Sequence, residues 1–100
     1  MTTTKRQGKY VVVRTYSAGV HAGELVSQKG KEVTLKNSRR IWYWKGAASL
    51  SELAMSGVKC PNECKFSVPV TQIVLTEAIE IIDCSKNGEK NIRAVPEWRA

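Results

Sequence analysis

β-branched and aromatic residues occur in short runs along this chain, and small or turn-forming residues separate the runs. Residues 10–16 hold three consecutive valines between two tyrosines, a composition typical of a β-strand. Lys29-Gly30 marks a hairpin between two further runs, and Asn37-Ser38 predicts a turn into the next one. The predicted strands are residues 10–16, 20–28, 32–35 and 39–45.

The sequence period changes after the last predicted strand. Ser49 and Glu52 fit a capping box, in which two side chains satisfy the free amides of a first helical turn. Leu50 and Leu53 share one helical face, and Gly57 stands where a C-terminal glycine belongs. These residues predict one short capped helix.

The rest of the chain is less constrained. Residues 58–70 predict a loop, and residues 72–83 fit either a strand or a helix, with their β-branched residues favouring the strand. Residues 85–95 allow a last short helix that Pro96 ends. Trp98 is expected to dock onto the folded body.

This order of elements predicts a β-rich α+β fold. One hundred residues suffice for one domain with a modest core, and we place it at residues 10–100. The alternatives are a small, partly closed barrel and a compact sheet of four to five strands, each with one short capped helix. Residues 1–9 are polar and basic and predict a disordered arm.

The net charge of +7 is concentrated in the first part of the chain. Residues 1–9 carry three cations and no acids, residues 10–59 eight cations and three acids, and residues 60–100 five cations and six acids. Such a field attracts phosphates or acidic protein surfaces, or serves solubility alone. No apolar run reaches the ~18 residues of a membrane span, and no secretory signal is recognisable, so we expect a cytoplasmic protein.

Residues 39–45, Arg-Arg-Ile-Trp-Tyr-Trp-Lys, combine three aromatic and three cationic side chains. Aromatic faces stack on flat rings, and guanidinium groups pair with phosphates. The competing interpretation is structural, with buried tryptophans and arginines that extend past them to solvent. Alternation along a strand would place Arg40, Trp42 and Trp44 on one face and Arg39, Ile41, Tyr43 and Lys45 on the other.

Three further residues extend this candidate site. Arg14 and Tyr16 lie two apart on the first predicted strand, and His21, the single histidine, lies between two glycines. No partner nucleophile or acid accompanies His21 in a recognisable motif, so we expect no enzymatic activity. The candidate ligand-binding residues are Arg14, Tyr16, His21, Arg39, Arg40, Trp42, Trp44 and Lys45.

The three cysteines make a weak metal motif. Cys60, Cys64 and Cys84 with His21 would be a permitted zinc set, but zinc sites usually come as two closely spaced pairs. We therefore expect reduced thiols and no cofactor. The acids Glu77, Glu80 and Asp83 fit no catalytic motif and predict a solvated face or salt-bridge partners for the basic strand.

Residues 13–23, 39–47 and 74–82 resemble a small family of uncharacterised bacteriophage proteins with an Arg-Ile-Trp-x-Trp-x-Gly-Ala core. The resemblance implies a phage or prophage source and a host bacterial cytoplasm, with no agreed function. By analogy with small phage proteins that counter host defence, we expect an oligomer that sequesters a small anionic signal, such as a cyclic nucleotide or an ADP-ribose derivative. The alternatives are an inhibitor of a host defence enzyme and, less favoured, a nucleic-acid-binding regulator; no membrane partner is expected.

Overall fold

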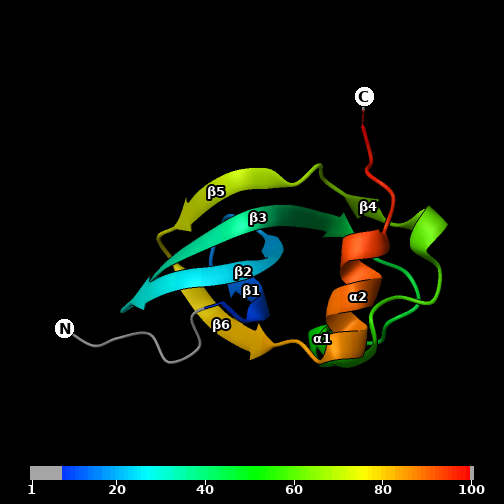
Figure 1. Cartoon of the computed structure of the whole chain (residues 1–100), viewed down its shortest axis with the longest axis horizontal. Coiled ribbons are helices and arrows are strands. Elements are labelled where there is room, and N and C mark those ends of the chain that lie inside the picture. The colour runs from blue at the N-terminus through cyan, green and yellow to red at the C-terminus, as the bar shows by residue number, and fades with distance from the viewer. Residues whose placement is uncertain (1–7, 100) are drawn as a thin grey trace.

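The computed structural model describes residues 8–99 (Figure 1). Residues 1–7, most of the predicted disordered arm, lie outside the described residues. The backbones of Gly8 and Lys9 are hydrogen-bonded to Leu25, so the folded part begins slightly earlier than predicted. The elements are β1 (Tyr10–Thr15), β2 (Val20–Lys29), β3 (Glu32–Tyr43), α1 (Leu50–Ser56), the 3-10 helix η1 (Pro61–Glu63), β4 (Lys65–Phe66), β5 (Val70–Leu75), β6 (Ala78–Asp83) and α2 (Lys86–Ala94).

Within this described part, six strands form one antiparallel sheet in the order β4-β3-β2-β1-β6. Strand β5 pairs with the first part of β3, on the side where β4 pairs with its end. The sheet curls without closing into a barrel, which confirms the β-rich α+β fold and selects the sheet over the barrel. It has more strands than the four to five predicted, because residues 72–83 form parts of two strands and β4 lies in the predicted loop.

Each face of the sheet has its own core. The inner face, on the inside of the curl, buries Val11, Val13, Leu25, Val33, Leu35 and Leu75. The helix-covered face buries Tyr10, Val12, Ala22 and Ile41 against residues of α1, α2 and β4, among them Leu53, Phe66 and Ile92. Figure 1 shows the two helices together at one end of the sheet. Both faces of the sheet bury apolar side chains, so β1 needs valines that project to each face.

A bulge makes β3 one strand where a turn was predicted. Asn37 has a φ of +52°, a left-handed conformation that asparagine tolerates better than most residues. The pairing with β2 shifts across this position, from Ala22–Arg39 to Glu24–Lys36. One extra residue in a strand exchanges its two faces. The bulge therefore turns Arg40 toward the inner face and Arg39 toward the helix-covered face.

The predicted capped helix is confirmed as α1. The hydroxyl of Ser49 accepts a hydrogen bond from the amide of Glu52 at 3.1 Å, and Glu52 Oε1 accepts from the amide of Ala48 at 2.8 Å. Gly57 ends the helix with a φ of +76°. The last short helix that residues 85–95 allowed is α2, which follows the N-cap Ser85 and ends before Pro96, so residues 8–99 contain two α-helices.

Candidate functional site

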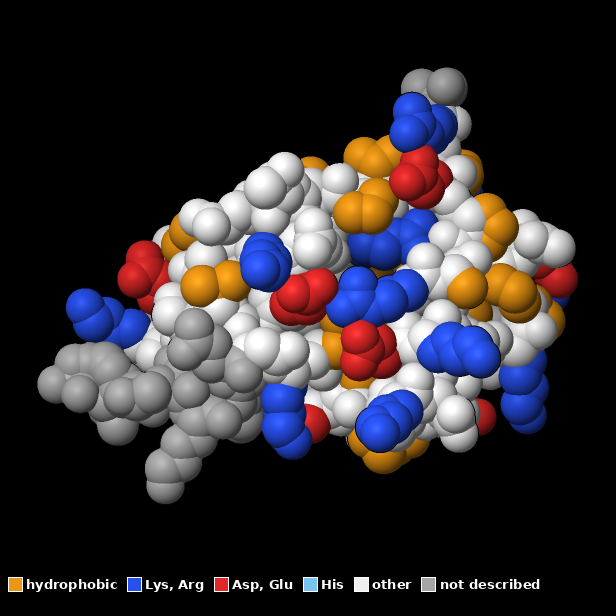
Figure 2. All heavy atoms as spheres, viewed as in Figure 1, with side chains coloured by type: hydrophobic (Ala, Val, Ile, Leu, Met, Phe, Trp, Pro, Cys, Tyr) orange, Lys and Arg blue, Asp and Glu red, His pale blue; other side chains and the backbone are white. Residues whose placement is uncertain are grey.

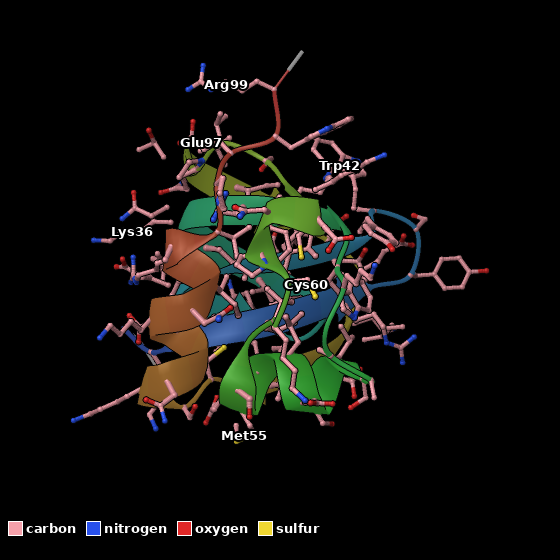
Figure 3. The ribbon with its side chains drawn as sticks, turned by 90° about the vertical axis from the view of Figure 1, so that its right-hand side faces the viewer. Lys36, Trp42, Met55, Cys60, Glu97 and Arg99 are labelled. Carbon is pink, nitrogen blue, oxygen red and sulfur yellow. The ribbon has the colours of Figure 1, made fainter. Side chains whose placement is uncertain are left out.

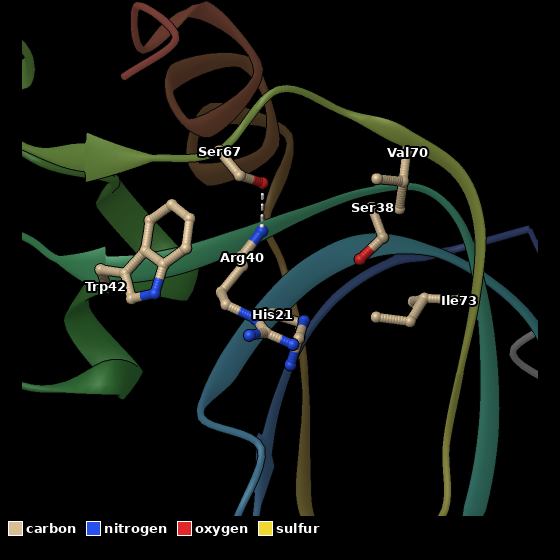
Figure 4. Close-up of a pocket in the computed structure, with 7 residues that line it drawn as sticks. All are labelled: His21, Ser38, Arg40, Trp42, Ser67, Val70 and Ile73. Atoms are coloured by element: carbon tan, nitrogen blue, oxygen red, sulfur yellow. Dashed lines mark hydrogen bonds between the residues drawn. The ribbon is translucent and has the colours of Figure 1, made fainter. Parts of the chain in front are cut away.

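The edge of β3 changes partner between β5 and β4, and a pocket lies at this change. Ser38 pairs with Val70 of β5, and Ile41 pairs with Phe66 of β4. Ser67 joins the connecting residues 67–69 to β3. Its amide donates to the carbonyl of Arg40, and its Oγ accepts a hydrogen bond from the amide of Arg40. The pocket beside these connecting residues has a volume of about 240 Å³ and is lined by His21, Ser38, Arg40, Trp42, Ser67, Val70 and Ile73 (Figure 4). Most of its exposed lining is apolar, and we call it the polar pocket after its His, Ser and Arg side chains.

Arg40 supplies the positive charge of the polar pocket. It pairs directly with His21 across β3 and β2, and directly paired residues project to the same face. Among residues 8–99, its guanidinium is the one arginine side chain without a hydrogen bond or an ion pair. The other four are bound: Arg14 to Glu80, Arg93 to Glu24 and Glu89, Arg99 to Glu97, and Arg39 to backbone carbonyls.

His21 lies fully buried in the wall of the same pocket. Its Nε2 is 3.0 Å from the carbonyl oxygen of Ala18. A carbonyl only accepts, so in the neutral ring Nε2 carries the proton and Nδ1 is an acceptor. Burial, together with the charge of Arg40, lowers the pKa of His21 below 6.5 against the opposing hydrogen bond to Ala18. The ring is therefore neutral near pH 7, and its Nδ1 has no hydrogen-bond partner among residues 8–99.

Ser38 carries a second unpartnered polar atom of the pocket. The residue is 1% exposed, and its Oγ has no hydrogen-bond partner within the described residues. A buried polar group left unpaired costs about 1–3 kcal/mol. Two such groups line one pocket beside an unpaired guanidinium, so the pocket offers hydrogen-bonding groups that the described residues leave unused.

Trp42 separates the polar pocket from a shallow aromatic depression of about 480 Å³, lined by Trp42, Tyr43, Lys65 and Trp98. Trp42 and Trp98 meet edge to face at 5.5 Å, and the ammonium of Lys65 lies 5.0 Å from the Trp98 ring. The amide of Trp98 also donates to the carbonyl of Phe66, so the predicted docking of this residue is confirmed. Figure 3 shows Trp42 near the C-terminal segment that carries Glu97 and Arg99. The three aromatic side chains remain about half exposed.

Three other residues of the 39–45 segment lie elsewhere. Arg39 is 3% exposed and is held in the helix-covered core by the carbonyls of Ser67 and Ile92, at 2.9 and 2.7 Å. Trp44 packs against the same core, so it does not share the face of Arg40 as strand alternation predicted. The reason is a second pairing shift at Trp42, after which β3 ends at Tyr43. Lys45 is exposed and pairs with Glu63 at 2.9 Å.

Arg14 and Tyr16 do not reach the pocket. Arg14 pairs with Val20, which packs on the helix-covered side, and its guanidinium binds Glu80 at 3.0 Å. Tyr16 follows β1 in the connection to β2 and is 77% exposed. Of the predicted site residues, the structure thus brings together His21, Arg40 and Trp42.

The cysteines do not form a metal cluster in the described residues, where no three His, Cys, Asp or Glu side chains are placed to share an ion. Cys64 is buried and its Sγ contacts the carbonyl of Cys60 at 3.4 Å. Cys84 packs at the helix-covered core, where burial raises the pKa of its thiol to about 12. Such a thiol is protonated at neutral pH and a poor metal ligand.

The acids Glu77, Glu80 and Asp83 were expected on a solvated face or as salt-bridge partners of the basic strand 39–45. Glu80 binds Arg14 of β1, Asp83 lies 4.0 Å from Lys9, and Glu77 accepts a hydrogen bond from Ser17. On the face shown in Figure 2, basic side chains are spread over the surface with acidic ones between them. This face offers no continuous basic stripe of the kind that follows a nucleic-acid backbone.

Four lining residues were not singled out from the sequence: Ser38, Ser67, Val70 and Ile73. Ser38 and Ser67 are ordinary turn residues in a sequence, and only the bulge and the change of strand partner give them a role. No signal in one sequence marks them.

No helix in the described part of the chain is long and apolar enough to cross a membrane. Comparison with curated proteins and with solved structures found no match. A family model does match, over residues 8–92, which include every residue of the polar pocket but not Trp98. The chain therefore belongs to the family described as "Domain of unknown function (DUF6948)".

Proposed function

We propose that this protein is a non-enzymatic binding protein that holds a small anionic molecule with a planar ring in the polar pocket. The observation that carries the proposal is the unpaired Arg40 guanidinium beside two unpartnered polar atoms, Nδ1 of His21 and Oγ of Ser38. A phosphate or carboxylate would receive charge-assisted hydrogen bonds from Arg40. The half-exposed Trp42 at the boundary of the pocket would stack the ring.

The volume of the pocket limits the size of the ligand. Ligand pockets usually measure ~300–1,000 Å³, and this one is about 240 Å³. It fits one charged group with its nearest ring or sugar, while the remainder of a larger ligand would extend over Trp42 into the aromatic depression. A second subunit would provide the rest of the enclosure, which is the reason we propose a homo-oligomer.

Nucleotide-type molecules have both of the required parts. The resemblance to bacteriophage proteins supports a role against host defence, in which a cyclic nucleotide or an ADP-ribose derivative is sequestered rather than turned over. His21 suits such binding better than catalysis, because one ring nitrogen is bound to Ala18, and burial and the charge of Arg40 oppose protonation of the ring by lowering its pKa.

Calorimetric titration with AMP, cyclic AMP, a cyclic dinucleotide and ADP-ribose tests the proposal. At least one should bind, and Arg40→Ala should weaken it at least about tenfold, the equivalent of one lost charge-assisted contact. Arg14→Ala is the matched control, because this arginine lies outside the pocket and is paired with Glu80. Failure of every probe to bind, or equal losses in both variants, would refute the proposal.

The aromatic depression favours a second candidate, in which the protein presses this surface on a host protein. Trp, Tyr and basic residues are typical of interface hot spots. Tyr43 and Trp98 line the depression but not the polar pocket, so Tyr43→Ala and Trp98→Ala separate the two functions. They should abolish capture of one defined partner from host lysate while leaving ring-free anion binding intact.

A further inference from the structure

The three polar groups of the pocket offer different hydrogen bonds. The Arg40 guanidinium only donates, the Ser38 hydroxyl donates or accepts, and the neutral His21 ring presents an acceptor at Nδ1. A fully ionised anion, which has only lone pairs, satisfies Arg40 but cannot satisfy Nδ1. The group beside the anion must therefore be a hydrogen-bond donor.

The spacing of these groups limits where that donor lies on the ligand. His21 and Arg40 are direct cross-strand partners, and the Cβ atoms of such pairs are about 4.5–5.5 Å apart. Ser38 lies two residues from Arg40 on the same strand and lines the same pocket. The anion and the donor must then belong to one small unit, such as a phosphate and a hydroxyl on the same sugar.

We propose that the pocket selects ribose 3′-phosphates, with Nδ1 of His21 accepting a hydrogen bond from the 2′-hydroxyl next to the phosphate that Arg40 binds. This inference rests on the proposed function and specifies its ligand. Ser38 contributes the second polar contact, and the base lies outside the pocket against Trp42. A 2′-deoxyribose 3′-phosphate would leave Nδ1 unpaired.

Matched pairs of ligands test the inference: adenosine 3′-monophosphate against its 2′-deoxy form, 3′,5′-cyclic AMP against its 2′-deoxy form, and 3′,5′-cyclic GMP against its 2′-deoxy form. For the wild-type protein we expect the hydroxylated member of at least one pair to bind about 10- to 100-fold more tightly, as expected when a buried polar group loses its partner. Calorimetry gives both affinities under the same conditions.

His21→Gln is the informative variant. The Gln amide nitrogen can replace Nε2 as the donor to Ala18, whereas its acceptor Oε1 lies one bond further along the side chain than Nδ1, so the preference for ribose should disappear. His21→Asn places an amide oxygen near Nδ1 and should retain part of the preference. If His21→Gln does not fold by thermal denaturation, Ser38→Ala provides the second test and should reduce the affinity for the hydroxylated ligands.

The outcomes separate this inference from the function it rests on. Equal affinity for both members of every pair, with binding still lost in Arg40→Ala, would overturn the ribose selection and leave anion binding standing. Binding of no probe by the wild-type protein would overturn both. A ribose preference that survives in His21→Gln would assign the selection to other residues and also contradict the inference.

Discussion

Arginine has opposite environments on the helix-covered face of the sheet and in the polar pocket on its inner side. Arg39 is buried on the first, stacked over the Phe66 ring at 5.3 Å and bonded to two carbonyls, while its Nη2 lacks a partner among residues 8–99. Arg40, its neighbour in the sequence, faces the second, and its guanidinium has no hydrogen bond or ion pair among residues 8–99. A buried charge is tolerated when it is hydrogen-bonded, so the fold explains most of the Arg39 side chain. The half-buried Arg40 guanidinium is left to solvent or to the ligand that we propose.

The largest effect is expected where the helix-covered side is packed most tightly. A Cβ added at Gly88 of α2 would lie 1.9 Å from the carbonyl oxygen of Ala54 of α1. Alanine normally favours a helix by about 1 kcal/mol over glycine, but this contact would force the helices apart. We expect Gly88→Ala to lower the free energy of unfolding by about 3 kcal/mol, measured by urea denaturation. Asn87→Ala, at an exposed position of the same helix, is the control and should have little effect.

The two adjacent arginines provide the next comparison. Arg39→Ala removes two hydrogen bonds to carbonyls from a side chain that is 3% exposed, and we expect a loss of about 2–3 kcal/mol of stability. Arg40→Ala should change stability by less than about 0.5 kcal/mol. Denaturation of both variants checks this. Similar losses in the two would mean that Arg40 is also a structural residue and would weaken the proposed function.

Much of this contrast could not be predicted from the sequence. The β-rich fold, the capped helix at Ser49 and the first strand follow from local patterns, because turn residues and caps act within a few residues. The face assignments beyond Lys36 do not, because Asn37 resembles a turn residue and acts as a bulge. One extra residue reversed the faces of the two arginines, and a second pairing shift at Trp42 sent Trp44 to the core.

The assembly of the pocket could not be predicted from the sequence either. His21 and Arg40 lie 19 positions apart in the sequence and become direct neighbours only through the pairing of β2 with β3. Ser38 gains its place from the bulge beside it. Arg40 and Trp42 could be named as candidate ligand-binding residues from their chemistry, but the pocket between them and its second polar group could not be predicted.

A smaller effect of opposite sign is expected at Ser38. Its Oγ is buried without a partner in residues 8–99, so Ser38→Ala removes an unsatisfied group and should raise stability by up to about 1 kcal/mol. A gain in stability together with weaker ligand binding would be typical of a binding site whose residues lower the stability of the fold. A loss of stability would show that the hydroxyl has a structural partner.

The smallest effect concerns the pH dependence of the ligand-free protein. His21 is the one histidine of the chain, and burial holds its pKa below the 6.5 of an unfolded chain. Between these two pKa values the unfolded chain binds more protons than the folded protein, so stability falls as the pH is lowered through this window and is constant above it. The slope is at most about 1.4 kcal/mol per pH unit, the value for one proton.

The lowered pKa of Glu24, caused mainly by its hydrogen bond to Arg93, acts below 4.5 and does not overlap this window. Urea denaturation between pH 7.5 and 5.5 should therefore show the decline in the wild-type protein and no decline in His21→Gln. A ligand that donates a hydrogen bond to Nδ1 stabilises the neutral ring in the folded protein. The decline in stability with falling pH should therefore be steeper when this ligand is bound. An identical pH profile in both proteins would mean that His21 titrates normally and is accessible to water, and the neutral acceptor on which the ribose selection depends would be lost.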